Sequence, residues 1–453
     1  MDISDRSVSI RGAESRTGPL SWSQLYMWDW LSQMRPYDQQ YNTSVELETA
    51  TPIALDHALN LVAALVSRHE SLRTRYYSGP AGSLMQETGG SGLVRVSISD
   101  DVIPSDQTAS AILKRKFDLS GDPPCHFTLI RDNNNVRKIV LTSSHLVIDG
   151  WSAGVLRQDF ADLLSRQRLG ILAKIKHPLD RAAWERSSQG QEANQAGLAH
   201  WTRILSGVPR AHFTRQTTHS SPRYQRAQMS SIAAGRAVRA LALENRVPQA
   251  AVPLTAFSRA VRSVTGNRRN AFWIVTHNRF KGGFRRSVGC FFRDTLVCLD
   301  ESPRPLLNTS AKLLESLRWT NTNPRDVVQI LHNDDRASYF SLARSLYYNF
   351  TSHEATRLPD LPLDKVEWTD GKDFDSQVLY LNVHLEGECL IMRLMADTWC
   401  VPRAAAEDIL QECVQDIVQS LPPMSRAHRS TPPATAPVDP TQKRAQSPLR
   451  FWT

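Results

Sequence analysis

The sequence has few cysteines, and their spacing does not suggest a metal site. No two of the six cysteines form a C-x-x-C pair. Such spacing suits neither a zinc site nor a dense disulfide framework. We therefore expect reduced cysteines, no bound metal and no cofactor of the protein's own. The cysteines are Cys125, Cys290, Cys298, Cys389, Cys400 and Cys413.

Long apolar runs are also missing. No stretch approaches the roughly 18 consecutive apolar residues that suggest a membrane-spanning helix. The N-terminal stretch MDISDRSVSIRGAESRTGPL lacks the apolar segment of a signal peptide. Apolar residues make up 41% of the chain and charged residues 22%, as in ordinary globular proteins. We expect a soluble, cytoplasmic protein without a membrane partner.

The charge is basic but not concentrated. The net charge of +9 is spread along the chain, apart from short groups such as Arg279–Arg286. Scattered charge does not favour nucleic-acid binding, whereas an acidic protein partner fits such a surface. The group at Arg279–Arg286 is interpreted either as part of such a surface or simply as a solvated face.

The length predicts more than one lobe. A chain of 453 residues exceeds the size at which one hydrophobic core usually stops growing. We predict a flexible N-terminus at 1–18, an N-terminal lobe at 19–180 and a C-terminal lobe at 181–421. Residues 422–453 are rich in proline, serine, threonine and basic residues, a composition typical of a disordered tail.

Helical and strand periodicities are mixed along both lobes. Apolar residues at helical spacing predict a helix over Ile53–Arg68. Phe127–Arg131 and Val136–His145 flank the turn-rich residues 132–135 and predict a β-hairpin, and Ala153–Leu164 predicts a helix. Together these segments indicate an α/β fold. Further helices are predicted at Leu198–Leu205, Val238–Val261 and Ala404–Leu421, strands at Ala271–Thr276 and Thr295–Leu299, and a hairpin at Val378–His384 and Cys389–Met395.

The stretch SSHLVIDGWS, residues 143–152, holds the strongest candidate site. It places His145 at the end of a predicted strand, with Asp149 and Gly150 shortly after it. A histidine has an ordinary pKa of about 6.5, so it exchanges protons near neutral pH. Taken alone, His145 fits a structural histidine as well as a catalytic one.

The same stretch contains a second pattern. Gly150–Gly154 reads G-W-S-A-G and matches the G-x-S-x-G elbow of α/β-hydrolases, with Ser152 as nucleophile and His384 as a possible base. The alternative is that Ser152 is the N-cap of the following helix. A short pattern with unconstrained partners favours the cap.

Several blocks, in order, resemble the condensation domain of nonribosomal peptide synthetases. The segment 144–150, SHLVIDG, is similar to the family's HHxxxDG motif, with Ser144 in place of the first histidine. Residues 20–28, LSWSQLYMW, resemble S-x-A-Q-x-R-L-W, and residues 68–74, RHESLRT, match R-H-E-x-L-R-T. Phe117–Leu119 corresponds to the FDL that precedes the hairpin.

The downstream half continues the resemblance. Residues 200–209, HWTRILSGVP, are similar to Y-W-x-x-x-L-x-G-x-P. Asn278-Arg279 and then 287–295, SVGCFFRDT, resemble the N-R and V-G-x-F-x-N-T segment, with Asp294 in place of the asparagine. The matches cover residues 19–421.

The resemblance implies a fold of two chloramphenicol-acetyltransferase-like lobes, arranged as a V-shaped pseudodimer with a central tunnel. Donor and acceptor carrier proteins would bring their phosphopantetheine arms to His145 from opposite faces. His145 would be the catalytic histidine. It would either deprotonate or position the acceptor, or stabilise the tetrahedral intermediate.

The remaining site residues are also implied by the resemblance. Asp149 would pair with an arginine of the second motif, Arg68 or Arg73, in a bidentate contact that fixes the loop. Gly150 would allow the substrate carbonyl to approach the backbone closely. Ser144 would hydrogen-bond locally. His126 stands where the family has an arginine and would alter the floor of the site.

We expect a stand-alone condensation enzyme that joins a carrier-bound acyl or aminoacyl thioester to an amine. No adenylation signature, carrier serine motif or second condensation block accompanies the motifs, so carriers would act in trans. Ester formation with a hydroxyl acceptor is a second hypothesis. A catalytically silent domain that recruits assembly-line partners is a third, supported by Ser144 and His126, and a serine hydrolase using Ser152 is a fourth.

Overall fold

The computed structural model divides the chain into two compact units. The first contains residues 1–195, 277–293 and 321–325, and the second contains 196–276, 294–320 and 326–453. The first unit therefore takes two segments from late in the chain, and the division falls at residue 195 rather than at 180. The structure describes residues 3–10, 14–99, 115–121, 123–133, 135–166, 175–208, 213, 220–280, 282–333, 346–353, 362–372, 375 and 377–421.

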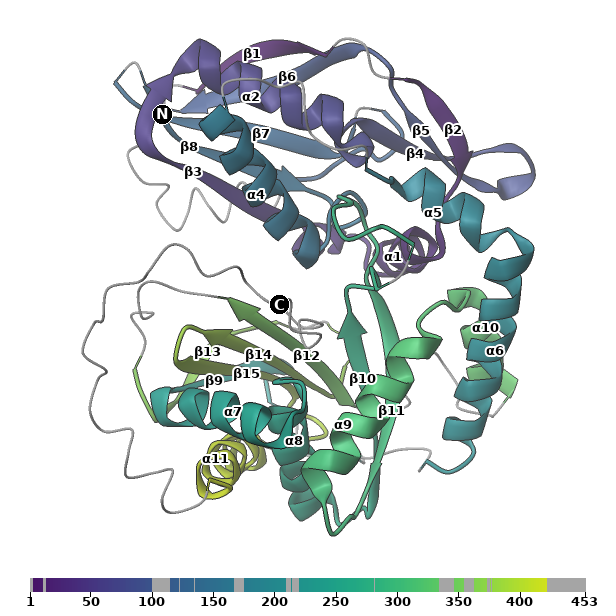
Figure 1. Ribbon diagram of the computed structural model, residues 1–453, viewed down its shortest axis with the longest axis vertical. Helices are drawn as coiled ribbons and strands as arrows, with labels where there is room; N and C mark the ends of the chain where they lie inside the picture. Colours follow the sequence, from purple (N-terminus) through teal and green to yellow (C-terminus); the bar gives the residue numbers. More distant parts are fainter. Residues whose placement is uncertain are drawn as a thin grey trace, which may run out of the picture. The chain divides into compact units, whose positions relative to one another are not determined.

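The first unit is built on a five-stranded mixed sheet. Its order is β1-β6-β7-β8-β3, with β6 and β7 parallel and the other neighbours antiparallel. Helices α2 and α4, coloured purple and blue-green in Figure 1, pack on this sheet and on each other. The strands are β1 (Ile3–Ile10), β3 (Thr43–Ala54), β6 (Gly92–Ser99), β7 (Cys125–Asp132) and β8 (Asn135–Ser143), and the helices are α2 (Leu55–Arg68) and α4 (Gly150–Arg166).

Local sequence explains helix α2. Its buried residues Ala58, Leu61, Val62, Leu65 and Val66 recur at intervals of three or four and form one apolar stripe. An aspartate in the first turn and an arginine in the last turn oppose the helix dipole favourably. The helix that the periodicity predicts over Ile53–Arg68 is confirmed.

The remaining elements of the first unit flank the sheet. A smaller antiparallel sheet has the order β2-β5-β4. The side chain of Ser21 and that of Gln24 form a capping box at the start of α1. These elements are β2 (Arg16–Pro19), β4 (Thr74–Ser78), β5 (Leu84–Thr88), α1 (Trp22–Gln33), α5 (Pro178–Glu185) and the first part of α6 (Ser188–Leu205).

The expected flexible N-terminus at 1–18 needs correction. Strand β1 pairs along its whole length with β6, from Ile3 opposite Ser99 to Ile10 opposite Gly92. Its sequence is mostly polar, but Val8 and Ile10 are buried. Apolar and polar residues alternate too weakly in this segment to predict a strand from the sequence. Its structure is decided by the pairing with a distant strand.

The second unit is built on a seven-stranded sheet with the order β11-β10-β12-β14-β15-β9-β13. The pairs β10–β12 and β12–β14 are parallel, whereas the pairs β14–β15, β15–β9 and β9–β13 are antiparallel. The strands are β9 (Tyr224–Ser231), β10 (Arg269–Thr276), β11 (Arg293–Asp300), β12 (Leu346–His353), β13 (Val366–Lys372), β14 (Leu379–Glu386) and β15 (Cys389–Asp397). The helices are α7 (Ile232–Asn245), α8 (Ala251–Thr265), α9 (Pro305–Ser316), α10 (Pro324–Asn333) and α11 (Arg403–Gln419).

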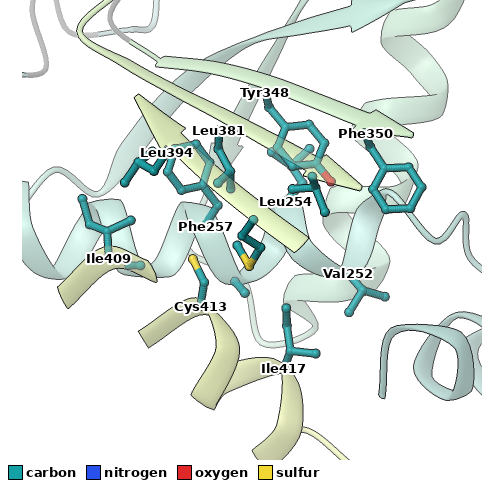
Figure 2. Close-up of a cluster of buried hydrophobic side chains, with 14 of the residues drawn as sticks. Val252, Leu254, Phe257, Tyr348, Phe350, Leu381, Leu394, Ile409, Cys413 and Ile417 are labelled. Carbon is teal, nitrogen blue, oxygen red and sulfur yellow. The ribbon is translucent and has the colours of Figure 1, made fainter. Parts of the chain in front are cut away.

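One face of this sheet carries the largest core. Helices α7, α8 and α11 pack there, and Figure 2 shows Phe257, Leu394 and Cys413 meeting between the sheet and the helices. On strand β14, Leu379, Leu381, Val383 and Leu385 face this core, and the residues between them do not. Alternation along the strand places the residues between them on the other face, where Tyr380 packs against a second hydrophobic cluster.

Most predicted elements are confirmed, with one correction. The single helix predicted over Val238–Val261 is two helices, α7 and α8. The break follows from Arg246, whose φ of 53° is left-handed, and from Pro248, which cannot continue a helical hydrogen-bond ladder. The hairpin of β14 and β15 turns at Gly387, which has a positive φ of 54°.

Other expectations meet the structure in part. The mixed α/β fold is confirmed, and the V shape with a central tunnel stays a prediction. In the described ranges, no helix combines the length and apolarity needed to cross a bilayer. All six cysteines are free thiols. The expected tail at 422–453 lies outside the described residues.

Candidate functional site

His145 lies in a tight turn directly after the end of β8. The backbone N–H of Val147 donates to the carbonyl of Ser144 at 2.9 Å and closes the turn. Within it, Nδ1 of His145 lies 2.9 Å from the carbonyl oxygen of Ile148. A carbonyl can only accept, so Nδ1 carries the proton. In the neutral imidazole, Nε2 is therefore the free acceptor.

The surroundings keep His145 neutral. Its ring packs on Phe292 with centroids 5.0 Å apart and planes 34° apart, and Tyr26 meets Phe292 edge-on at 5.8 Å. Burial among these groups lowers the pKa of His145, and the nearby charge of Asp149 opposes this only in part. The ring remains partly exposed. The site thus holds an imidazole that is unprotonated near neutral pH.

Asp149 is the N-cap of helix α4. Its Oδ1 accepts from the backbone N–H of Ser152 at 3.0 Å, three residues into the helix. The sequence prediction that Ser152 is the N-cap is therefore wrong. The helix begins at Gly150, three residues before the predicted start at Ala153.

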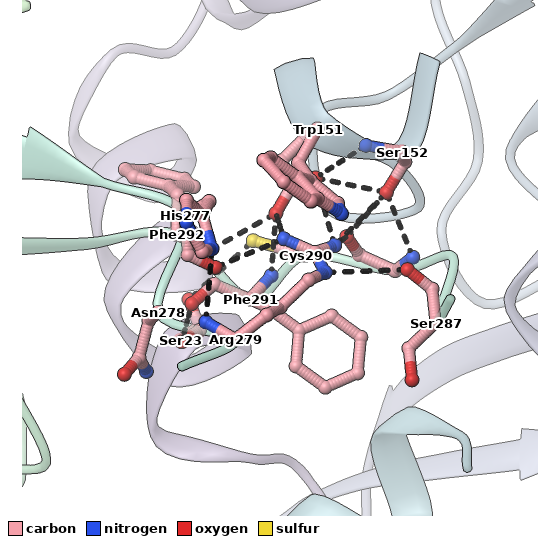
Figure 3. A network of polar contacts seen from close by, with 12 residues as sticks. Ser23, Trp151, Ser152, His277, Asn278, Arg279, Ser287, Cys290, Phe291 and Phe292 are labelled. Carbon is pink, nitrogen blue, oxygen red and sulfur yellow. Dashed lines mark hydrogen bonds and ion pairs between the residues drawn. The ribbon is translucent and has the colours of Figure 1, made fainter. Parts of the chain in front are cut away.

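Asp149 also forms a buried, bidentate ion pair with Arg279, which Figure 3 shows beside Ser152 and Phe291. Nη1 and Nη2 of Arg279 donate to Oδ2 and Oδ1, each at 2.9 Å. The backbone N–H groups of Phe291 and Phe292 donate to Oδ2 at 2.9 and 3.1 Å. Burial by itself would raise the pKa of Asp149, but Arg279 and these donors hold it below its ordinary value. The carboxylate thus ties His145's turn to the residue that packs on His145.

The predicted partners of Asp149, Arg68 and Arg73, are wrong. Arg68 instead donates through Nε to Asp159 at 2.7 Å. Arg73 donates to the backbone carbonyls of Glu14, at 3.2 Å, and Gly89. The second motif therefore organises a different part of the unit, because its arginines already have partners.

Arg279 also corrects the interpretation of the basic group at 279–286. Its side chain is fully buried, so it is not part of a solvated face. All of its N–H donors point to Asp149, Ser152 or the carbonyls of His277, Ser287 and Gly289. Arg279 is a structural cation that fixes the late segment on α4.

Ser152 takes part in this network in a way that argues against a nucleophile. Its hydroxyl oxygen lies 2.8 Å from Oδ1 of Asp149 and 3.0 Å from the carbonyl oxygen of Gly289, and both acceptors compete for its single proton. The same oxygen accepts from Nη2 of Arg279 at 3.1 Å and from the N–H of Gly289 at 3.0 Å. The described residues supply no histidine to deprotonate it, and the side chain is buried. His384, its suggested base, bonds to Thr351 at 2.8 Å.

Ser144 and His126 occupy positions beside the turn. The hydroxyl of Ser144 accepts from the N–H of Leu146 at 3.4 Å, a long contact that agrees with the predicted local role. Nε2 of His126 lies 2.9 Å from the hydroxyl of Ser97, which donates to Asp5 at 2.8 Å. Burial lowers the pKa of His126 to about 4, so it is neutral. No hydrogen bond in the described ranges joins His126 to His145.

Two glycines differ in what they require. A Cβ at Gly289 would lie 2.6 Å from the ring of Phe291 and 2.7 Å from Pro178, so the close packing of this segment needs glycine. A Cβ at Gly150 would meet no described atom within 4 Å. The predicted role of Gly150 beside a substrate carbonyl therefore stays a prediction.

Sequence reasoning missed Arg279 as the partner of Asp149 and Phe292 as the neighbour of His145. Both lie in segments whose motifs are recognisable, Asn278-Arg279 and 287–295. The sequence gives no signal that these segments contact the turn of His145, because Arg279 is 130 residues from Asp149 along the chain. A buried carboxylate that forms two parallel hydrogen bonds needs an arginine as its partner, and the Asn278-Arg279 pair contains one.

The chain resembles known proteins over most of its length. The family described as "Condensation domain" matches residues 14–296. Phosphinothricin tripeptide synthetase PhsC of Streptomyces viridochromogenes is 30% identical over 218 residues, 45% of this chain and 20% of that protein. Malpibaldin synthetase of Mortierella alpina is 26% identical over 389 residues, 79% of this chain and 7% of that protein. The chain spans a fifth or less of these relatives.

Solved structures agree in fold. The epimerization domain from the third module of tyrocidine synthetase B superposes with a TM-score of 0.69 at 15% identity, over 90% of this chain and 98% of that one. The structure of condensation domain-mediated chain release from the enacyloxin polyketide synthase gives a TM-score of 0.70 at 16% identity, over 89% and 83%.

Proposed function

We propose a function from one premise, that this chain belongs to the condensation-domain family. Its activity is the transfer of an acyl or aminoacyl group from a carrier-bound thioester to an amine, which forms an amide. His145 is the catalytic residue. Asp149 and Arg279 are positioning residues that hold its turn.

The tautomer of His145 supports this proposal more than any other observation. Because Nδ1–H donates to Ile148, the neutral ring offers Nε2 as a proton acceptor. The lowered pKa keeps it in that form near neutral pH. Stabilising an oxyanion would instead require a donor at Nε2, that is, a protonated ring. The geometry therefore favours the base or positioning role over the second role that the resemblance implies.

The transfer balances with His145 as the only proton carrier. The amine nitrogen attacks the thioester carbonyl and loses a proton to Nε2. The tetrahedral intermediate collapses with cleavage of the C–S bond, and the departing thiolate takes the proton from the imidazole. An amide and a free carrier thiol result, and no redox reagent is needed. A positioned base of this kind typically contributes about 10²–10⁴-fold in rate.

The substrates of this proposal arrive on phosphopantetheine arms of carrier proteins that are supplied in trans in the cytoplasm. One arginine close to the site, Arg285, is exposed and suits an acidic partner. A free amine is an equally suitable acceptor. A hydroxyl acceptor would use the same histidine and give an ester.

The test is an acyl-transfer assay. The protein is incubated with a separately purified, acyl-loaded carrier and a panel of amines and alcohols, and the acyl group is followed by intact-protein mass spectrometry. We expect transfer to an amine that falls at least about 100-fold in His145→Ala. Ser152→Ala should retain transfer.

Other outcomes identify the alternatives. Loss in Ser152→Ala with a normal rate in His145→Ala would indicate a serine hydrolase. Transfer only to alcohols would replace the amide with an ester. A wild type that binds the loaded carrier but never accelerates transfer would overturn the enzymatic proposal in favour of a silent recruiting domain.

A further inference from the structure

Phe292 places a partly exposed aromatic ring against the imidazole of His145. The ring centroids lie 5.0 Å apart, with planes 34° apart. Both side chains keep part of their surface accessible, whereas the preceding residue, Phe291, is fully buried. His145 and Phe292 both belong to the first compact unit, so their contact is a feature of that unit alone. The surface beside the imidazole is thus aromatic.

The backbone on both sides of the Phe291–Phe292 peptide bond is held by hydrogen bonds that do not involve the ring. The N–H of Phe292 donates to Oδ2 of Asp149 at 3.1 Å. The carbonyl oxygen of Phe291 accepts from Oγ of Ser23 at 2.9 Å. A change of the side chain at position 292 leaves both bonds available. The ring can therefore be altered while the support that Asp149 gives to this segment is kept.

The ring of Phe292 rests on a buried aromatic support from helix α1. Tyr26 meets it edge-on, with centroids 5.8 Å apart and planes 73° apart, an arrangement that aromatic pairs favour. Tyr26 in turn contacts Trp30 at 6.5 Å, and the guanidinium of Arg293 lies 5.4 Å from the centroid of the Tyr26 ring. Tyr26 and Trp30 are both buried. This support fixes the orientation in which Phe292 lies beside His145.

The geometry of the transfer step brings part of a substrate close to this ring. The attacking nitrogen must come within roughly 2.6–3.2 Å of Nε2 of His145, and the thioester carbonyl carbon within about 3–3.5 Å of that nitrogen. The carbons bonded to these two reacting atoms then lie in the range of distances at which Phe292 packs on the imidazole. An apolar substituent gains by displacing water from a phenyl ring, whereas a hydroxyl group loses hydrogen bonds that the ring does not replace.

We propose that Phe292 is a specificity-determining residue. Its ring contacts the substituent on the carbon next to a reacting atom, in the acyl donor or in the amine, and selects an apolar substituent over a polar one. This role in substrate selection rests on the proposed function. His145 carries the proton, and Phe292 distinguishes substrates by contact alone. Because Tyr26 fixes the ring, the same aromatic surface meets every substrate.

Substrate pairs of equal shape test this role. Valyl and threonyl thioesters on the carrier are compared as donors, and valinamide and threoninamide as acceptors, so that each pair differs by a methyl group against a hydroxyl group. In the wild type, the valine member of one pair should have a kcat/KM at least about tenfold higher. Phe292→Ala should lower that ratio at least about threefold, because the apolar contact is lost. The pair that shows the preference identifies the substrate that the ring contacts.

The ratio separates substrate selection from support of the imidazole. Both members of a pair are measured on the same sample, so an inactive fraction cancels. Equal slowing of both members in Phe292→Ala, with the ratio unchanged, would overturn the proposal. Phe284→Ala is the matched control: it removes a phenyl ring of the same late segment, but that ring packs against Phe291 at 5.5 Å and should leave the ratio unchanged. A wild type that transfers without preference in either pair overturns the proposal and leaves the function standing.

A binding measurement tests the contact without the reaction. The full chain is labelled with 4-fluorophenylalanine, and the fluorine NMR signal of position 292 is identified by its loss in Phe292→Leu. N-acetylvaline methylamide and N-acetylthreonine methylamide, whose side chains lie beside both a carbonyl and an amide nitrogen, are titrated in. The signal should shift with saturation, with a Kd at least about threefold lower for the valine compound. That result supports the contact even if no transfer is found. An unchanged signal, or equal Kd values, contradicts it.

Discussion

Two buried carboxylates of the α4 region, Asp149 and Asp159, have similar partners and different consequences. Asp149 binds Arg279, and Asp159 binds Arg286, so both hold the same late segment of the chain. Asp149 also accepts from the backbone of Phe291 and Phe292, beside His145. Asp159 instead accepts from residues of the second motif.

The partners of Asp159 explain what that motif does. Nε of Arg68 and Nε2 of His69 lie 2.7 and 3.0 Å from its Oδ2. Burial alone would raise the pKa of Asp159, but hydrogen bonds from His69 and Arg68 hold it well below its ordinary value. Asp159 therefore fastens α2 to α4, whereas Asp149 shapes the turn that carries His145. Equal burial does not mean equal function.

The largest effect is expected from Asp149→Asn. The change leaves Arg279 buried without its counter-charge, so the free energy of unfolding should fall by about 3–5 kcal/mol. Because the backbone of Phe292 loses its acceptor beside His145, transfer should slow by at least about 100-fold. Urea unfolding and the acyl-transfer assay measure the two effects.

The contribution of the Asp149 carboxylate to stability can also be measured by lowering the pH. The folded pKa of Asp149 is lowered, so its contribution to stability is present above the unfolded value of about 3.9 and is lost as the pH falls below it. Asp149→Asn should show less of this acid-induced loss. Asp132→Asn, at an exposed turn, serves as control and should behave as the wild type does. Normal transfer by Asp149→Asn would contradict its positioning role.

Asp159→Asn should separate stability from activity. Arg286 is about half exposed and Arg68 is partly exposed, so both can turn toward water when the carboxylate charge is removed. The free energy of unfolding should fall by about 1.5–3 kcal/mol. Transfer by the folded fraction should stay within about threefold of the wild type. A loss of transfer as large as that of Asp149→Asn would remove the distinction between the two carboxylates.

Ser152→Ala probes the shared part of the Asp149 network. Its hydroxyl accepts from Arg279 and from the N–H of Gly289, so removal leaves buried donors with one partner fewer. We expect a loss of about 1–3 kcal/mol in the free energy of unfolding and near-normal transfer. Ser152→Thr, which keeps the hydroxyl, tests whether the loss comes from the hydrogen bonds. If transfer is abolished in a stable Ser152→Ala protein, Ser152 would again be a candidate nucleophile.

The smallest effect is expected from Ser144→Ala. The only side-chain hydrogen bond that the described residues give Ser144 is the 3.4 Å contact from Leu146, near the limit of a hydrogen bond. The free energy of unfolding should change by less than about 1 kcal/mol, with transfer within about threefold. A large loss of transfer would show that the position of the family's first histidine has a chemical role here.

Much of the fold could be predicted because local patterns decide it. The stripe of α2, the hairpin of β7 and β8 and the turn at Gly387 each depend on residues close in sequence. The site could be predicted at His145 and Asp149, which stand in one motif. The ion pair with Arg279 could not, because two nearer arginines, Arg68 and Arg73, were equally suitable in charge.

Two further differences have the same physical origin. Strand β1 is too polar to be recognised before its partner β6 is known, since pairing over 80 residues or more leaves no local trace. Asp149 rather than Ser152 caps α4, and both residue types suit an N-cap. In each case, contacts with residues distant in the sequence decide which of two locally possible structures forms.

The pH dependence of the transfer step tests the central claim most directly, that His145 acts as a neutral imidazole held by its turn. Single-turnover transfer to an amine of low basicity is measured from pH 5 to 8 in the wild type and in His145→Gln. Because burial lowers the pKa of His145, the wild-type rate should be constant near neutrality and should fall only below the ordinary histidine value of about 6.5. The variant should be at least about 100-fold slower at every pH. A wild-type midpoint above that value, or a His145→Gln protein with the wild-type rate, would contradict the account.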